Sequence, residues 1–257
     1  LSRLGEAVER QARFDEAAAL IEAAYEGMRK TLGDDALATW VVLNRLTGNF
    51  LDQGRLGEAE VLLRRAYDRV EGKRGSDHAQ ALNIRNALSG VLLLSGEGAE
   101  AEAIQRSLLS NPRIGGSGND KLKVTVLMNL SKALRVQGRY SEAERIMREV
   151  AAIVTPENRW DGTTVSGVKV DLAGLLVPQS KVDEANKLTA EALLLLGPET
   201  GSSRYLIGLA QYERARIRML QGRFGEAIEA AAIATRAFDA EAKSWTVDGF
   251  QAQSVQA

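Results

Sequence analysis

The stretch that decides the fold is LNRLTGNFLDQGRLGEA, which runs from Leu43 to Ala59. Large apolar side chains at positions 43, 46 and 50 recur at the spacing of one face of an α-helix. Gly54 then interrupts the pattern, as a residue that tolerates a positive φ does at a helix end. A second amphipathic stretch begins at Leu56 and continues through the Glu58-Ala59 pair. The segment therefore predicts two helices joined by a short turn.

The Glu-Ala pair of this segment recurs at a fixed interval along the chain. It stands at positions 16–17, 58–59, 100–101, 142–143, 184–185 and 226–227, a step of 42 residues without insertion or deletion. Six such units fill nearly all of the 257 residues. A period in this range is typical of a solenoid. We expect units at about residues 1–39, 40–81, 82–123, 124–165, 166–207 and 208–249, with a tail at 250–257.

The two residues of each pair have different expected roles. The alanine should lie where the two helices of a unit cross, because a larger side chain would push them apart. The glutamate should face solvent and support the first turn of its helix through the helix dipole. Six identical acids that are each one repeat apart cannot converge on one substrate atom. We therefore interpret the glutamates as structural and not as catalytic.

Composition excludes several classes of function. With 33 basic and 34 acidic side chains, the net charge of −1 gives no global field that favours nucleic acid or an anionic membrane. The chain has no cysteine and one histidine, His78, which excludes disulfides, thiolate zinc sites and histidine metal clusters. No apolar run reaches the roughly 18 residues of a membrane span. We predict no cofactor, no metal and no enzyme activity, and a cytoplasmic location.

The repeats resemble the tetratricopeptide repeat (TPR) family. The residues that carry the resemblance are Leu1, Leu4, Gly5, Val8, Phe14 and Ala17 in the first unit, Leu43, Leu46, Thr47, Phe50, Gly54, Leu56 and Ala59 in the second, and Leu127, Leu130, Ser131, Leu134, Gly138, Tyr140 and Ala143 in the fourth. The usual TPR unit has about 34 residues. The longer period of 42, with connectors at 30–35 and 75–78, resembles the kinesin light chain subgroup.

The resemblance implies an all-α fold, a right-handed α-solenoid (superhelix) of about six helix-turn-helix TPR units. It also implies a concave groove, lined mainly by the first helix of each unit, that receives a peptide. The residues expected to face this groove are Asn44, Arg45, Asn83, Asn86, Asn129, Lys132, Arg135, Tyr212 and Arg216. Asparagine amides can pair with a peptide backbone, and arginine can hold a carboxylate in a bidentate manner.

Charge on the first helices favours an acidic ligand. Eight basic residues stand there, Arg45, Arg85, Lys132, Arg135, Lys169, Arg214, Arg216 and Arg218. The acidic residues are Asp52, Asp171 and Glu213. A positive groove would prefer acidic peptides or C-terminal carboxylates. The alternative is that several of these charges are solvated or paired with the second helices.

The sixth unit departs from the pattern, because Arg214 and Arg218 stand where apolar residues belong. We expect its first helix to be rotated, so that Tyr212, Ala215 and Met219 face inward. Such a change would suit a terminal repeat with a more polar outer face.

Four other features have local interpretations. His78 is expected to act in a loop or as a helix cap, because a general base would need an oriented partner and a pocket. The run Gly115–Gly118 is interpreted as a flexible loop, since no Lys-Ser/Thr follows it. Trp160 is either a packed loop anchor or part of a contact surface. Trp245 and Phe250 predict an added capping helix.

Two functions remain open. The first is a non-catalytic protein–protein interaction scaffold or adaptor that binds a peptide or partner segment, with no nucleic acid and no membrane as partner. The alternative is a ligand- or partner-sensing region of a larger signalling protein, such as a kinase, a nucleotide-hydrolysing switch or a transcriptional regulator. The short first unit and the start at Leu1 predict that the natural protein extends upstream. The oligomeric state is left open.

Overall fold

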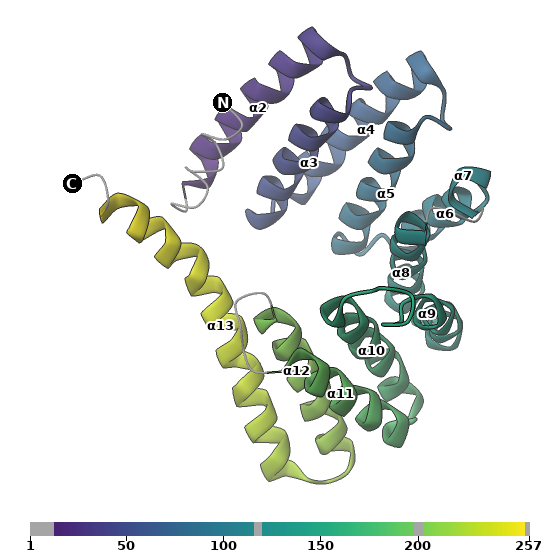
Figure 1. Cartoon of the computed structure of the whole chain (residues 1–257), viewed down its shortest axis with the longest axis vertical. Helices are drawn as coiled ribbons and strands as arrows, with labels where there is room; N and C mark the ends of the chain where they lie inside the picture. The colour runs from purple at the N-terminus through teal and green to yellow at the C-terminus, as the bar shows by residue number, and fades with distance from the viewer. Residues whose placement is uncertain (1–12, 116–119, 198–202, 255–257) are drawn as a thin grey trace. The chain divides into compact units, whose positions relative to one another are not determined.

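The chain is built from helix pairs (Figure 1). In the computed structural model the described residues are 13–115, 120–197 and 203–254, and they contain no strand. The helices form two compact units, one from α2 to α7 and one from α8 to residue 244 of α13. The expected all-α solenoid of helix hairpins is confirmed. None of the helices within the described ranges has the length and hydropathy of a membrane span.

Within each compact unit, the first helix of a repeat alternates with the second helix. These are called the A helix and the B helix of that repeat. The first unit contains α2 (Phe14–Leu32), α3 (Leu37–Asp52), α4 (Leu56–Arg74), α5 (Ala79–Leu94), α6 (Gly98–Leu109) and α7 (Pro112–Gly115). The second contains α8 (Asp120–Val136), α9 (Tyr140–Ile153), α10 (Gly162–Leu176), the 3-10 helix η1 (Val177–Gln179), α11 (Val182–Leu196), α12 (Arg204–Leu220) and α13 (Phe224–Ser254) up to residue 244. The A helices are α3, α5, α8, α10 and α12.

The turn between an A helix and its B helix has one geometry in five repeats. Glycines at 54, 96, 138 and 222 adopt φ values of 69°, 82°, 74° and 70°. The residue after the glycine donates its backbone N–H to a carbonyl in the last turn of the A helix, as Arg139 does to Leu134 at 2.9 Å. In the fifth repeat Ser180 takes the glycine position with φ 59°, and Lys181 donates to Leu176 at 3.1 Å. A non-glycine residue thus adopts the left-handed conformation there.

The recurring Glu-Ala pairs have the roles expected of them. The alanines at 17, 59, 101, 143, 185 and 227 are all buried, and the glutamate side chains before them are between 41% and 57% exposed. Four of the glutamates form ion pairs with the arginine three residues earlier, at positions 13, 55, 139 and 223. The burial of the alanines and the exposure of the glutamates are both confirmed.

Small polar side chains are accommodated at the helix crossings by backbone carbonyls. Ser131 Oγ donates to the carbonyl of Ala143 at 3.0 Å, and Ser166 Oγ donates to that of Ala192 at 3.3 Å. Around them the A helices bury apolar faces, such as Leu127, Leu130 and Leu134 of α8. Each crossing can therefore be close without leaving a buried hydroxyl unpaired.

The expected rotation of α12 is wrong. Tyr212 and Met219 are 51% and 55% exposed, whereas Arg218 is buried. The buried positions Ile207, Ala210, Gln211, Ala215, Ile217 and Arg218 match the buried positions Thr39, Val42, Leu43, Thr47, Asn49 and Phe50 of α3, four repeats earlier. The helix keeps its register because Arg218 finds polar partners, with Nη1 donating to Gln221 at 2.7 Å and Nε lying 3.1 Å from Glu226.

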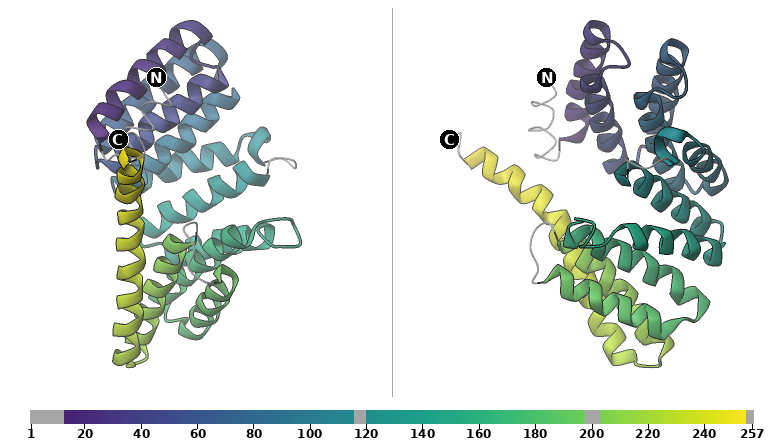
Figure 2. Two further views of the ribbon diagram at one scale, coloured as in Figure 1. Left: turned by 60° about the vertical axis from the view of Figure 1, so that its left-hand side comes forward. Right: turned by 45° about the vertical axis from the view of Figure 1, so that its right-hand side comes forward.

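The remaining local predictions have mixed outcomes. His78 caps α5, where its Nδ1 accepts from the backbone N–H of Gln80 at 3.3 Å. No separate capping helix forms from the final segment, because α13 continues as one helix to Ser254 (Figure 2). Trp160 is half-buried. The first helix of repeat 1 and residues 116–118 of the glycine run lie outside the described residues, as do the side chains at 245 and 250.

Candidate functional site

All nine residues predicted to line a groove stand on A helices. They are Asn44 and Arg45 on α3, Asn83 and Asn86 on α5, Asn129, Lys132 and Arg135 on α8, and Tyr212 and Arg216 on α12. The first four belong to the first compact unit and the other five to the second.

In the first unit, the asparagines of α5 bond within their own repeat. Gln105 of α6 donates from Nε2 to Asn86 Oδ1 at 3.1 Å and to Ser89 Oγ at 2.7 Å. Asn83 donates from Nδ2 to Gln80 Oε1 at 3.3 Å. The Asn86 carbonyl therefore faces the B helix of its repeat, a placement that the spacing on α5 alone did not indicate.

In the second unit, side chains from α8 and α10 surround a small recess. Lys132 and Arg135 of α8 line it together with Asp171 of α10. Among the residues that the structure describes, no hydrogen bond or ion pair joins Asp171 to either cation. Burial raises the pKa of Asp171, and the positive charges of Lys132 and Arg135 oppose the rise. The three groups are thus close enough to interact electrostatically without direct pairing.

A second acid, Glu213 of α12, extends this surface. Its carboxylate packs against Gly174 of α10, where an added Cβ would lie 3.0 Å from Glu213 Oε1. Arg216 Nη1 lies 2.8 Å from Glu213 Oε2, and its guanidinium is 5.8 Å from the centroid of the Tyr212 ring. Burial raises the pKa of Glu213, against the attraction of the Arg216 charge. Because Gly174 has no side chain, the Glu213 carboxylate has room to pack against α10.

These groups form one polar surface, here called the A-helix cluster: Lys132, Arg135, Asp171, Glu213 and Arg216. Besides Arg216, the pKa of Glu213 responds to the charges of Arg135 and Asp171, which links α8, α10 and α12. Three cations and two acids leave the cluster with little net charge. The sequence identified its members but not their proximity.

Other basic residues of the A helices face neighbouring B helices, either of the preceding repeat or of their own. The guanidinium of Arg85 lies 5.7 Å from the centroid of the Tyr67 ring of α4. Lys169 Nζ lies 2.6 Å from Glu191 Oε2 of α11. An A helix has more than one face that reaches solvent, so counting its charges overstated the positive charge of a single surface. Pairing with the second helices, the alternative raised above, holds for both residues.

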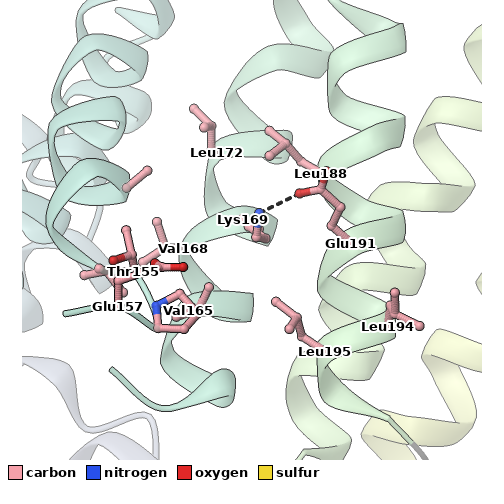
Figure 3. A pocket seen from close by; sticks show the side chains of 13 residues that line it. Thr155, Glu157, Val165, Val168, Lys169, Leu172, Leu188, Glu191, Leu194 and Leu195 are labelled. Atoms are coloured by element: carbon pink, nitrogen blue, oxygen red, sulfur yellow. Dashed lines mark hydrogen bonds and ion pairs between the residues drawn. The ribbon is translucent and has the colours of Figure 1, made fainter. Parts of the chain in front are cut away.

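A pocket of about 430 Å³ lies between α9, α10 and α11 (Figure 3). Its walls are mainly apolar and include Val154, Val165, Val168, Leu172, Leu188 and Leu195. The ion pair of Lys169 with Glu191 forms part of the wall. Lys169 stands two residues before Asp171, which is about 200° around the helix. This apolar pocket therefore lies on the other side of α10 from the A-helix cluster.

Sequence models of the tetratricopeptide repeat match residues 1–72 and residues 124–154. Tetratricopeptide repeats are therefore present in both compact units of the chain. No curated protein matches it.

Solved structures share the fold of this TPR protein at low sequence identity. BtubC (BKLC) from P. vanneervenii has a TM-score of 0.69 and 18% identity, over 88% of this chain and 91% of that one. A putative kinesin light chain from Podosopora anserina with nearly identical TPR-like repeats has a TM-score of 0.59 and 17% identity, over 76% and 92%. A Rap protein complexed with competence and sporulation factor has a TM-score of 0.58 and 15% identity, over 93% and 74%. The repeats are thus kinesin-light-chain-like in fold.

Three cavities of this TPR protein lie at equivalent positions of different repeats. Each cavity is beside a B helix and over the A helix that follows it. The hollow between α2 and α4, over α3, measures about 620 Å³ and is lined by Leu46 and Phe50. The apolar pocket over α10 has Leu172 at the position of Leu46. The hollow between α11 and α12 measures about 400 Å³ and has Arg214 and Arg218 at those two positions. The same architectural site thus carries different chemistry along the chain.

Proposed function

We propose that this TPR protein is a protein–protein interaction scaffold that holds a peptide or partner segment against the A-helix cluster. The observation that carries the proposal is the arrangement of Lys132 and Arg135 around Asp171. In the part of the chain that the structure describes, these side chains face one recess without bonding to one another. Their hydrogen-bonding capacity is therefore open to a ligand.

The chemistry of the cluster suits a peptide. Lys132 and Arg135 can bind a carboxylate or backbone carbonyls of a ligand, while Asp171 can accept from its N–H groups. The aromatic ring of Tyr212 is exposed beside Arg216 and can contact a side chain of the ligand. The Rap protein of similar fold was solved with competence and sporulation factor, which supports a binding role for this fold. Binding, with no chemical step, is the function we propose.

A peptide array tests the proposal with two charge-reversed proteins. One carries Lys132→Glu with Arg135→Glu, and the matched control carries Arg145→Glu with Arg236→Glu, two exposed arginines on the B helices α9 and α13. We expect the first protein to lose binding of most array peptides by about tenfold or more, because close charge pairs at interfaces are strongly coupled. The control should bind as the wild type does.

Two results would count against the proposal. Equal binding by the wild type and the Lys132→Glu, Arg135→Glu protein would remove the A-helix cluster as the site. The preference for acidic ligands is tested separately, by replacing each Asp and Glu of a bound peptide with Lys. A lysine-substituted peptide that binds as well as its parent would reject that preference.

A further inference from the structure

Helix α11 exposes two leucines near its C-terminal end. Leu194 is 83% exposed and Leu195 is 45% exposed. Leu194 lines both the apolar pocket and the hollow between α11 and α12. The two cavities therefore meet at one exposed apolar side chain, within the second compact unit.

The apolar pocket has room for a bulky side chain. Its volume of about 430 Å³ falls in the range of small-ligand sites. Lys169 and Glu191 on its wall already pair with each other, because Lys169 Nζ is 2.6 Å from Glu191 Oε2. An occupant would gain mainly from burial of apolar surface, about 25 cal/mol per Å².

The second cavity, here called the arginine groove, is lined by Asn186, Thr189, Ala190, Leu193, Leu194, Arg214 and Arg218. Arg214 is exposed and, within the described residues, has no hydrogen bond or ion pair. The side chain of Arg218 is 10% exposed, and its Nε makes no hydrogen bond although Glu226 Oε2 is 3.1 Å away. Burial, and then the charges of Arg223 and Arg214, lower the pKa of Arg218 against the attraction of Glu226. The groove thus holds more positive charge than its neighbours balance.

Packing alone does not explain these arginines. In the second repeat the same two positions hold Leu46 and Phe50, which are buried in the core. Placing the Arg218 guanidinium at a buried position costs free energy unless an anion compensates it, and Glu226 lies 3.1 Å from its Nε. Arg214 is exposed and adds a second positive charge to the groove, with no anion paired to it among the described residues. A carboxylate from a partner molecule would pair with Arg214 and balance the remaining positive charge of the groove.

We propose that the apolar pocket, Leu194 and the arginine groove together bind one partner segment, which carries a bulky apolar side chain and, within a few residues, an Asp or Glu. The apolar side chain enters the pocket over α10, and the carboxylate pairs with Arg214 and Arg218. The apolar pocket lies on the other side of α10 from the A-helix cluster, so the proposed surface is a second contact of the scaffold.

Selection from a random twelve-residue peptide library displayed on phage tests the inference on the whole chain. Enriched peptides are synthesised, and their Kd values are measured by fluorescence anisotropy on the wild type and on variants. Leu194→Glu and Arg214→Glu alter two exposed positions, so the variants should fold, which circular dichroism checks. Arg145→Glu is the control for charge, and Lys132→Glu reports on the A-helix cluster.

We expect selected peptides to combine a bulky apolar residue with Asp or Glu. Their Kd should rise about tenfold or more on Leu194→Glu and on Arg214→Glu, and should stay within about twofold on both control variants. Changing the peptide's acid to its amide should weaken binding to the wild type but not to Arg214→Glu. Either the recovery of no such peptide or binding that Leu194→Glu leaves intact would overturn the inference. Peptides lost only on Lys132→Glu would support the A-helix cluster and reject this second surface.

Discussion

At the scale of single residues, Ser180 shows how strictly the repeat geometry is kept. Four other turns place glycine at this position, and all five share positive φ values and the same backbone hydrogen bond. A residue with a Cβ pays roughly 1–2 kcal/mol for the left-handed conformation. The fifth turn therefore holds its geometry against a local preference.

Ser180→Gly is expected to raise the free energy of unfolding by about 0.5–1 kcal/mol. The variant relieves the left-handed strain, and the greater freedom of glycine in the unfolded chain cancels part of the gain. Urea denaturation followed by circular dichroism measures the change. Gly138→Ser, the reverse exchange at the equivalent turn, should lose a similar amount. Unchanged midpoints in both proteins would show that the turn conformation is not under strain.

Asp171 of the A-helix cluster predicts a dependence of stability on pH. Burial raises the pKa of Asp171, so its protonated form favours the folded state. The stabilisation is complete below the unfolded pKa of about 4 and is lost as the pH rises through the higher folded pKa. Asp171→Asn should match the wild type in thermal midpoint at low pH and exceed it increasingly towards pH 8.

Asp34 provides the control of opposite sign. Burial opposes ionisation of this carboxyl, but hydrogen bonding to Lys73 at 2.8 Å and the charges of Lys73 and Arg69 lower its pKa overall. Its stabilisation is present above the unfolded pKa and is lost as the pH falls. Asp34→Asn should therefore fall below the wild type as the pH rises. Parallel curves for the Asp171→Asn protein and the wild type would contradict the assignment of Asp171.

At the scale of helices, the crossing of α8 with α9 depends on a small residue. Ala143 is fully buried, and its carbonyl accepts a hydrogen bond from Ser131. Ala143→Trp should lower the free energy of unfolding by about 1–3 kcal/mol or more, because overpacking separates the helices. Thermal unfolding measures the loss. Arg145→Trp, at an exposed position of the same helix, should change stability little, and an equal loss in both variants would argue against overpacking as the cause.

The helices show what the sequence could and could not predict. The turns and the crossing alanines were predictable, because the same geometric constraint recurs every 42 residues. The register of α12 was not, since burial of Arg218 depends on Gln221 and on Glu226 of the following helix. The hydrogen bond that Asn86 accepts was not predictable either, because its donor, Gln105, stands 19 residues later on another helix. The apolar pocket escaped prediction because its volume is set by side chains of three helices together.

At the scale of the whole molecule, adjacent B helices are tied by a repeated ionic motif. Arg64 bonds to Glu60 on its own helix and to Glu100 on the next B helix, both at 2.9 Å. Arg148 makes the equivalent pair of contacts 84 residues later, with Glu144 at 2.9 Å and Glu184 at 2.8 Å. Each tie connects only neighbouring repeats, as expected for a solenoid.

Glu144→Ala should loosen one such tie without unfolding the chain. The Glu144 carboxylate is buried and also bonds to Lys181 at 2.6 Å and Gln179 at 2.8 Å. Because its cationic partners are about half exposed, we expect a loss of only about 1–2 kcal/mol. Hydrogen exchange should accelerate in α9 to α11 and remain unchanged in α3 to α5. Glu149→Ala is the surface control, and uniform acceleration along the chain would contradict local coupling.

The ties between B helices also have a mechanical consequence. Arg64, Arg148 and the glutamates that join them to the next repeat are 41–46% exposed, so dissolved ions screen these pairs. The Debye length is about 8 Å at physiological salt and about 3 Å at 1 M. The contacts between an A helix and its B helix are mainly apolar, and burial of apolar surface is not screened by dissolved ions. Higher ionic strength should therefore weaken the contacts between neighbouring repeats more than the contacts within each helix hairpin. The repeats would then bend more easily relative to one another at high salt than at low salt.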